Sequence, residues 1–296
     1  MDRVIFIINP RSGFKINKFV ERNIINKISV RRINYAIEYT KQKGDAFTIT
    51  IKYLNKGFNR VVCVGGDGTL REILEAVAGK NNVIVGIIPC GSGNGAARNL
   101  KIPLNLDEAF EIALGNKIVD IDCGICNSKL FFNICGIGFD AHIAKMFNKN
   151  RIRGLLPYFL YGIISYIKFK PIDIEVEYGG KKDFFKPFVV AVANGSQYGG
   201  GAIISPRSSL IDGKLDLIVV DNTDFFYLIR RIHTLFNGKI LENDKVKYLT
   251  SEVFKIKLPP GSIYHLDGED FISEDGVLKI TTLPKAVKFA VKNEIL

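Results

Sequence analysis

A glycine-rich turn with a single carboxylate is the first residue pattern that could do chemistry. The segment GGDGT at 65–69 lies directly after the apolar run at 61–64 and directly before a helical pattern at 70–77. Glycines let a backbone approach a polyphosphate closely, and a helix N-terminus favours negative charge. Asp67 would repel phosphates unless a divalent cation lies between them. The turn therefore favours phosphoryl transfer, although a plain glycine turn with an Asp helix cap has the same residues.

Two further polar loops follow apolar runs in the same half of the chain. NPRSG at 9–13 ends the first run, and PCGSGNG at 89–95 follows the run at 83–89. Both offer backbone amides and small polar side chains that bind anions. Because neighbouring ends of parallel strands face one crevice, we expect the loops to meet at one phosphorylated ligand.

A cluster of carboxylates in the last tenth of the chain is a candidate general base. In HLDGED at 265–270, three acidic residues flank a glycine. A carboxylate within hydrogen-bond reach of an alcohol accelerates its deprotonation by ~10² to 10⁴. A solvated acidic hairpin turn would show the same pattern, so the segment alone leaves both interpretations open.

The elements that must position these residues change in character at about residue 118. Before it, β-branched apolar runs alternate with helical patterns, which predicts a parallel sheet buried on both faces. After it, short strand-like runs are separated by Gly, Asn and Asp, which predicts an antiparallel sandwich or barrel-like domain. At 296 residues the chain exceeds the usual ~100 to 200 residues of one domain, so we expect two.

Composition narrows the class of partner and the compartment. A net charge of +11 indicates an anionic partner, which could be nucleic acid, a phosphorylated ligand or acidic lipid headgroups. No aromatic RNA-binding or helix-turn-helix signature is present, so we expect no nucleic acid. The N-terminus lacks the pattern of a secretion signal, and five cysteines are typical of reduced thiols in a cytoplasm. Cys123 and Cys126 have zinc-ligand spacing, but no second pair follows.

One strongly apolar segment, GLLPYFLYGIISYI at 154–167, is too short to span a bilayer. Basic residues flank it on both sides: Lys149, Arg151, Arg153, Lys168 and Lys170. It is either an ordinary core helix or a helix that contacts lipid.

Seven motifs in order resemble the diacylglycerol kinase and sphingosine kinase catalytic superfamily, most closely its bacterial lipid kinase branch. They are NPRSG, GGDGT, PCGSGN followed by AARNL, FFNICGIGFDA, ANGSQYGGG, DGKLDLIVV and HLDGE. The resemblance implies an NAD kinase-like α/β nucleotide-binding domain with a parallel sheet at 1–118, completed by about 284–296. It also implies an antiparallel β-sandwich domain for the acceptor at 119–283, and ATP and Mg²⁺ as cofactors.

The resemblance also implies roles for individual residues. ATP contacts are implied for Asn9, Pro10, Arg11, Ser12, Gly13, Thr40, Gly65, Gly66, Asp67, Gly68, Thr69, Leu70, Arg71, Glu72, Gly91 and Ser92. Asp67 would help to organise the phosphates and their metal, and Glu269 matches the general base. A structural Mg²⁺ site would use Asp212 with backbone carbonyls of Ser209 and Lys214. Gly95 departs from the motif, because many bacterial members carry Asp there.

We therefore expect an ATP-dependent lipid kinase of phospholipid biosynthesis that phosphorylates a lipid hydroxyl, most simply converting diacylglycerol to phosphatidic acid. It would be cytoplasmic and peripherally bound to an anionic membrane surface. The alternatives are a soluble small-molecule kinase of the NAD kinase type and a non-catalytic nucleotide-binding protein. Phosphatidylglycerol, a sphingoid base or a polyprenol could replace diacylglycerol as acceptor, and the sequence leaves open whether the protein is a homodimer.

Overall fold

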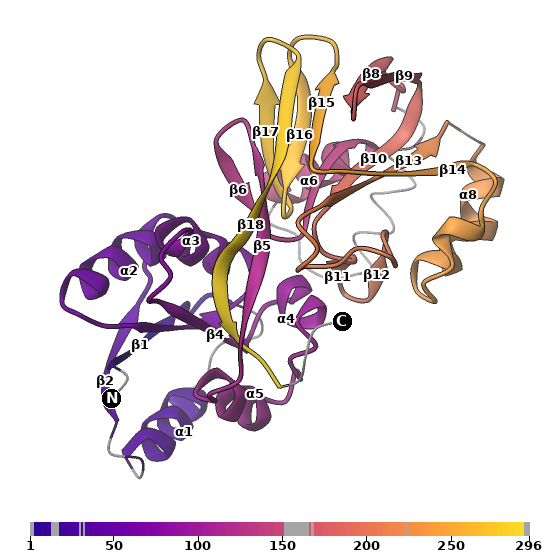
Figure 1. Cartoon of the computed structure of the whole chain (residues 1–296). Helices are drawn as coiled ribbons and strands as arrows, with labels where there is room; N and C mark the ends of the chain where they lie inside the picture. Colours follow the sequence, from indigo (N-terminus) through magenta and orange to yellow (C-terminus); the bar gives the residue numbers. More distant parts are fainter. Residues whose placement is uncertain are drawn as a thin grey trace. The chain divides into compact units, whose positions relative to one another are not determined.

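The computed structural model of the chain describes residues 3–12, 18–29, 31, 33–150, 166, 169–222 and 224–292, without the side chains of 18–21 and 147–150. The chain divides into two compact units (Figure 1). Unit 1 consists of Met1–Ile121 and Lys285–Leu296, and unit 2 of Asp122–Pro284. The apolar segment at 154–167 lies outside the described residues except for Tyr166, so the alternatives for it stay predictions.

A parallel sheet forms the centre of unit 1, as predicted. Its strands are β1 (Arg3–Ile8), β2 (Asn34–Tyr39), β3 (Arg60–Gly65), β4 (Ile84–Pro89) and the end of β18 (Val277–Ala290). The order is β2-β1-β3-β4-β18, and β18 joins β4 in parallel through Lys288 and Phe289. Apolar side chains bury β1, β3 and β4 on both faces, which explains their nearly continuous apolar runs.

Helices lie on both faces of this sheet (Figure 1). They are α1 (Lys18–Ser29), α2 (Asp45–Asn55), α3 (Asp67–Val77), α4 (Gly95–Asn99) and α5 (Leu106–Ala113). One core contains Ile24 of α1 and Phe110 of α5, which stacks on Phe6 of β1 at 6.1 Å between ring centroids. α2 and α3 pack against each other. α3 begins at Asp67, so the last three residues of GGDGT form its first turn.

Unit 2 is an antiparallel β-sandwich, which confirms the predicted fold class. One sheet has the order β14-β13-β10-β7-β16-β17, and the other continues β18-β15-β8-β9. Inward side chains of both sheets meet in one core, for example Leu217 and Val190 with Val176 and Ile256. The bounds are β7 (Ile134–Gly138), β8 (Ile174–Tyr178), β9 (Lys181–Phe185), β10 (Pro187–Ala193), β13 (Leu215–Asp221), β14 (Val246–Ser251), β15 (Val253–Lys257), β16 (Ser262–Leu266) and β17 (Glu269–Ser273).

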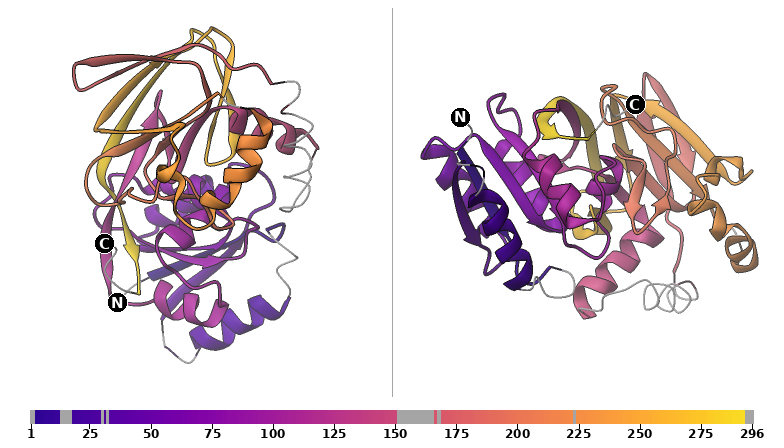
Figure 2. Two further views of the ribbon diagram at one scale, coloured as in Figure 1. Left: turned by 90° about the vertical axis from the view of Figure 1, so that its right-hand side faces the viewer. Right: turned by 90° about the horizontal axis from the view of Figure 1, so that it is seen from below.

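The remaining elements belong to unit 2 and its connections (Figures 1 and 2). They are β5 (Ile118–Cys126), β6 (Lys129–Phe131), α6 (Phe139–Asn150), β11 (Gln197–Gly199), β12 (Ala202–Ile203), α8 (Phe225–Arg231), η1 (Ile232–Leu235) and η2 (Ile240–Glu242). β5 ends in a turn after Cys126. Within the part of the chain that the structure describes, no helix has the length and apolarity needed to cross a membrane.

Candidate active site

The three predicted loops lie together in unit 1, at the carboxyl ends of β1, β3 and β4. The amide of Cys90 donates to the carbonyl oxygen of Gly65 at 2.8 Å, which joins the third loop to the second. A Cβ on Gly66 would lie 3.0 Å from the Cα of Gly91 and 3.4 Å from the Oγ of Ser12 in the first loop. Glycine therefore permits a close approach that a side chain would block.

Asn9 shapes the first loop and joins it to α3. Its Nδ2 donates to the hydroxyl oxygen of Thr69 at 2.9 Å, and its Oδ1 accepts from the amide of Arg11 at 3.0 Å. The amide of Ser12 donates to the carbonyl oxygen of Asn9 at 3.1 Å. Gly13 lies outside the described residues. Four predicted ATP contacts in the three loops are exposed: Pro10, Arg11, Gly68 and Ser92.

Asp67 is the only carboxylate in the sequence of the three loops. Its Oδ2 accepts from the amide of Gly95 at 3.0 Å, and its Oδ1 accepts from the amide of Ala96 at 2.9 Å. Burial raises the pKa of Asp67, while these amides act in the opposite direction. An ionised carboxylate has about four lone-pair positions, so each oxygen retains the capacity to face a cation. Asp67 therefore caps α4, and this cap is compatible with the predicted role in organising a metal.

Glu72 connects α3 to the loop that follows β2, a contact that sequence reasoning missed. Its carboxylate accepts from the amides of Gly44 at 2.8 Å and Ala46 at 3.0 Å, at the start of α2. Thr40 begins this loop, is buried, and donates its amide to the carbonyl oxygen of Ile8. Glu72 thus holds the Thr40 loop beside α3, and the predicted ATP contacts of both stay predictions.

The remaining predicted positions of α3 differ in their accessibility. Gly68 is exposed, whereas Thr69, Leu70 and Arg71 are each at most 7% exposed. Arg71 donates to the carboxylate of Glu75 at 2.9 Å. The amide of Leu70 donates to the carbonyl oxygen of Gly66 at 3.1 Å, so its predicted contact with ATP stays a prediction.

Asn94 closes the third loop into a ring. Its Oδ1 accepts from the amide of Gly91 and its Nδ2 donates to the carbonyl oxygen of Gly91, both at 2.8 Å. Asn94 has a left-handed backbone (φ 48°), a conformation that Asn tolerates better than most residues. The motif contained this signal, because an Asn among glycines is typical of such a turn.

The predicted acidic cluster of unit 2 separates into residues with different tasks. Asp267 and Gly268 form a two-residue turn with positive φ between β16 and β17. The carboxylate of Asp267 accepts from three consecutive backbone amides at 132–134, at 2.7, 2.7 and 3.0 Å. It therefore fixes the connection between β6 and β7 to this turn. Glu269 follows the turn as the first residue of β17 and is half-buried.

A buried polar network supports the same turn. Nδ1 of His265 accepts from the amide of Gly268 at 3.2 Å, so Nε2 carries the ring proton and faces Oδ2 of Asp140 at 3.2 Å. That oxygen also accepts from the hydroxyl of Tyr198 at 2.9 Å, and Oδ1 accepts from the amide of Ala141 at 2.8 Å. The network holds the turn that presents Glu269.

Replacing Gly136 by Ala is expected to destabilise the protein by about 1 to 3 kcal/mol, the usual cost of overpacking. A Cβ on Gly136 would lie 2.1 Å from Nε2 of His265 and 2.2 Å from Oδ2 of Asp140. Denaturant unfolding measures the change. Gly68→Ala is the control, because nothing lies within 4 Å of its added Cβ. Equal stability of the two variants would contradict the packing argument.

The predicted metal loop has oxygen ligands of the kind that Mg²⁺ prefers. Oδ1 of Asp212 accepts from the amide of Lys214 at 3.0 Å. Burial raises the pKa of Asp212, and the nearby charges of Asp216 and Asp122 act in the same direction. A cation would relieve that repulsion. No group of three or more His, Cys, Asp or Glu side chains in the described ranges could hold a metal, so Ser209 and other carbonyls with water would have to complete the site.

Sequence models of two domain families match the chain, one after the other. The diacylglycerol kinase catalytic domain matches residues 3–126, and the YegS C-terminal NAD kinase beta sandwich-like domain matches residues 133–291. The chain belongs to the diacylglycerol kinase-like family of bacterial lipid kinases. The resemblance in the seven motifs is therefore confirmed.

Relatives of this lipid kinase family member match along almost their whole length. A diacylglycerol kinase of Bacillus subtilis is 28% identical, over 91% of this chain and 90% of the relative. A YegS-like lipid kinase of Yersinia enterocolitica is 25% identical, over 90% of each chain. A solved diacylglycerol kinase structure from Bacillus anthracis has a TM-score of 0.79 at 20% identity, covering 100% of this chain and 98% of that one. An NAD kinase from Archaeoglobus fulgidus in complex with ATP has the same fold at a TM-score of 0.54 and 17% identity, covering 99% and 94%.

Two of the seven motifs of this lipid kinase family member contain positioning residues whose roles the sequence did not indicate. FFNICGIGFDA supplies Gly136 and Asp140, and ANGSQYGGG supplies Tyr198. All three belong to the network around His265. The signal was their membership of ordered motifs, since a lone Asp or Tyr in this composition indicates nothing by itself.

Proposed function

We propose that the chain transfers the γ-phosphate of ATP to the hydroxyl of a membrane lipid, with diacylglycerol as acceptor and phosphatidic acid as product. The observation that carries this proposal is the meeting of the three loops, where Gly66 and Gly91 touch backbone to backbone beside Ser12. Such glycine-lined strand ends before a helix are suited to a polyphosphate. The names of the relatives supply the acceptor class.

The loops of unit 1 would bind the triphosphate through backbone amides and the side chains of Arg11, Ser12 and Ser92. Bound Mg²⁺ would supply positive charge that screens the γ-phosphate. Asp67 would hold the second and third loops together through the two hydrogen bonds that it accepts from backbone amides. Its remaining lone pairs would face that cation. In this arrangement most of the rate acceleration comes from positioning and electrostatics.

Glu269 would act as the general base of the reaction. It takes the proton of the lipid hydroxyl as the oxygen forms its bond to the γ-phosphorus, while the bond to the bridging oxygen of ADP breaks. Asp267 is less suited to this task because its carboxylate already accepts three amide hydrogen bonds. We further propose that the protein works in the cytoplasm, at an anionic membrane surface.

Transfer of labelled γ-phosphate tests the proposal. The protein is incubated with ATP and Mg²⁺ and a panel of lipids in mixed micelles, beside NAD and a reaction without acceptor. Label in diacylglycerol is the expected result. Label in NAD alone would overturn it in favour of a soluble kinase, and label in another lipid would correct the acceptor.

Alkylation of Cys90 is expected to report ATP binding without any turnover. Cys90 lies in the third loop and is half-buried, whereas the other four cysteines are buried. Burial raises the pKa of Cys90 to about 11, so little thiolate is present at pH 8 and alkylation is slow but rises with pH. ATP with Mg²⁺ should slow the modification at Cys90, measured by mass spectrometry of peptides. Unchanged modification by saturating ATP would contradict binding at these loops.

A further inference from the structure

Large apolar side chains are exposed together on the segment that follows β13. Phe226 of α8 is 76% exposed and Ile229 is 43% exposed. Ile232 of η1 is 38% exposed, and Phe236, directly after η1, is 54% exposed. Single exposed apolar residues are ordinary, but four within so short a segment indicate a contact surface.

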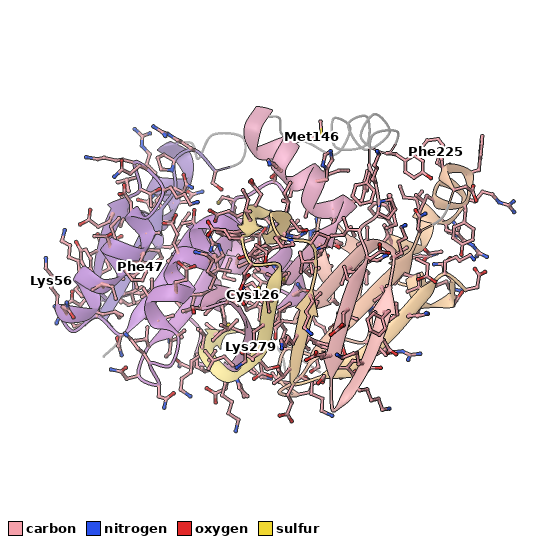
Figure 3. All side chains as sticks on the ribbon, turned by 90° about the horizontal axis from the view of Figure 1, so that it is seen from above. Phe47, Lys56, Cys126, Met146, Phe225 and Lys279 are labelled. Carbon is pink, nitrogen blue, oxygen red and sulfur yellow. The ribbon has the colours of Figure 1, made fainter. Side chains whose placement is uncertain are left out.

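Local hydrogen bonds keep α8 and η1 formed, and Leu235 attaches the segment to unit 2. Asp224 caps α8 by accepting from the amide of Tyr227 at 2.9 Å. Thr234 is buried and donates to the carbonyl oxygen of Arg231 at 2.6 Å. Leu235 packs against the outer face of the sheet that contains β10 and β13. The views of the ribbon place α8 at the margin of unit 2, and Figure 3 marks Phe225 at its start (Figures 2 and 3).

The exposed charges on the segment itself are positive, whereas the acidic residues lie at its borders: Asp224 caps α8, Asp244 accepts from the hydroxyl of Tyr227, and Glu242 pairs with Lys239. Residues 225–241 contain Arg230, Arg231 and Lys239 and no Asp or Glu. Arg230 and Arg231 are exposed, and Arg231 also lies 5.9 Å from the ring centroid of Tyr227. An apolar face with exposed arginines matches a membrane that has anionic headgroups above its acyl chains. A second copy of a chain with a net charge of +11 would bring like charges together.

We propose that this α8–η1 surface, formed by Phe226, Ile229, Arg230, Arg231, Ile232 and Phe236, docks the protein on an anionic lipid bilayer. The aromatic and aliphatic side chains enter the boundary between headgroups and acyl chains, and the arginines contact lipid phosphates. The inference rests on the proposed function, because an enzyme that phosphorylates a membrane lipid must reach the bilayer. It assigns the docking to α8 and η1, and Tyr166 lies beside α8 at 5.2 Å between its ring centroid and that of Phe225.

Fluorescence offers a direct test, since the chain contains no tryptophan. Phe226→Trp places a single probe on the surface, and Phe184→Trp is the matched control on β9, where the Phe is 71% exposed. Vesicles of phosphatidylcholine with phosphatidylglycerol should shift the emission of the first variant to shorter wavelength and leave the second unchanged. No shift of Phe226→Trp, or equal shifts of both, would overturn the proposal. A shift that depends on protein concentration without vesicles would point to self-association and would also overturn it.

Sedimentation with the same vesicles measures the contribution of the charges. Arg230→Gln with Arg231→Gln should weaken binding roughly 20- to 30-fold, since each cation near an anionic surface contributes about fivefold. Phosphatidylcholine vesicles should bind weakly, and added salt should release the protein. Binding of the double variant equal to that of the unchanged protein would overturn the role of the arginines.

Two readouts separate this proposal from the proposed function. Transfer of phosphate to lipid in mixed micelles, and protection of Cys90 by ATP, should be unchanged in the arginine variant. A protein that docks through this surface but phosphorylates no lipid would overturn the function and support the docking. The docking alone would be overturned if the protein phosphorylates micellar lipid, Phe226→Trp behaves like Phe184→Trp, and the arginine variant binds vesicles like the unchanged protein.

Discussion

Asp67→Asn is expected to lower the rate of phosphoryl transfer on the order of 10²- to 10³-fold, the scale of removing one preorganised electrostatic group. Asn removes the negative charge that would face the cation on the phosphates. It can still accept a hydrogen bond from the amide of Gly95 or of Ala96, but not from both. One amide of α4 then loses its acceptor, at a cost of about 1 to 3 kcal/mol of stability. The variant should therefore fold and bind ATP without efficient turnover.

Steady-state kinetics with titrated Mg²⁺ checks this expectation. If Asp67 helps to organise the metal, the Asn variant needs more Mg²⁺ for half-maximal rate. Asp107→Asn is the matched control, because Asp107 lies on α5 and forms a surface ion pair with Lys27. Full activity of Asp67→Asn at the usual Mg²⁺ concentration would remove Asp67 from the mechanism and leave it as a cap of α4.

Glu269→Gln is expected to reduce turnover by about 10² to 10⁴, the range for a general base. Gln has nearly the same shape but cannot accept the proton of the lipid hydroxyl. Because the turn is held by Asp267 and His265, the substitution should leave the hairpin in place. The pH profile of kcat should lose its dependence on the base at low pH, while protection of Cys90 by ATP should persist.

Asp270→Asn is the informative partner of this variant. Asp270 is the next residue of β17 and therefore points to the opposite face of the strand. Its cross-strand neighbour is His265, whereas the neighbour of Glu269 is Leu266. If Asp270→Asn abolishes turnover and Glu269→Gln does not, the base has been assigned to the wrong carboxylate of HLDGED.

The network around His265 suggests how unit 2 maintains the geometry of its turn. Asp140 comes from α6 and Tyr198 from β11, so elements far apart in sequence reach a single histidine ring. The missing side chain of Gly136 provides the space. Substitutions here should act on turnover through the position of Glu269, because none of these groups was predicted to touch the substrate.

The class of each half of the fold could be predicted from local pattern. Apolar runs such as 61–64 and 83–89 indicate strands that are buried on both faces. The short strand-like runs after residue 118 indicate an antiparallel sheet. The loops themselves were also visible, because glycine, proline and small polar residues at strand ends have few structural alternatives. The order of seven motifs then indicated the family.

The contacts that give the site residues their tasks were decided only by the tertiary structure. Asp67 meets an amide 28 residues away, and Asp267 meets one 135 residues away. Periodicity and composition report which face a side chain occupies, but not which distant backbone amide comes within hydrogen-bond reach. A sequence could therefore reveal three loops with the composition expected of a phosphate site, and an acidic turn. Only the packing of the strands and helices shows that Asp267 serves the fold, that Glu72 holds a neighbouring loop, and that α8 leaves its apolar side chains exposed.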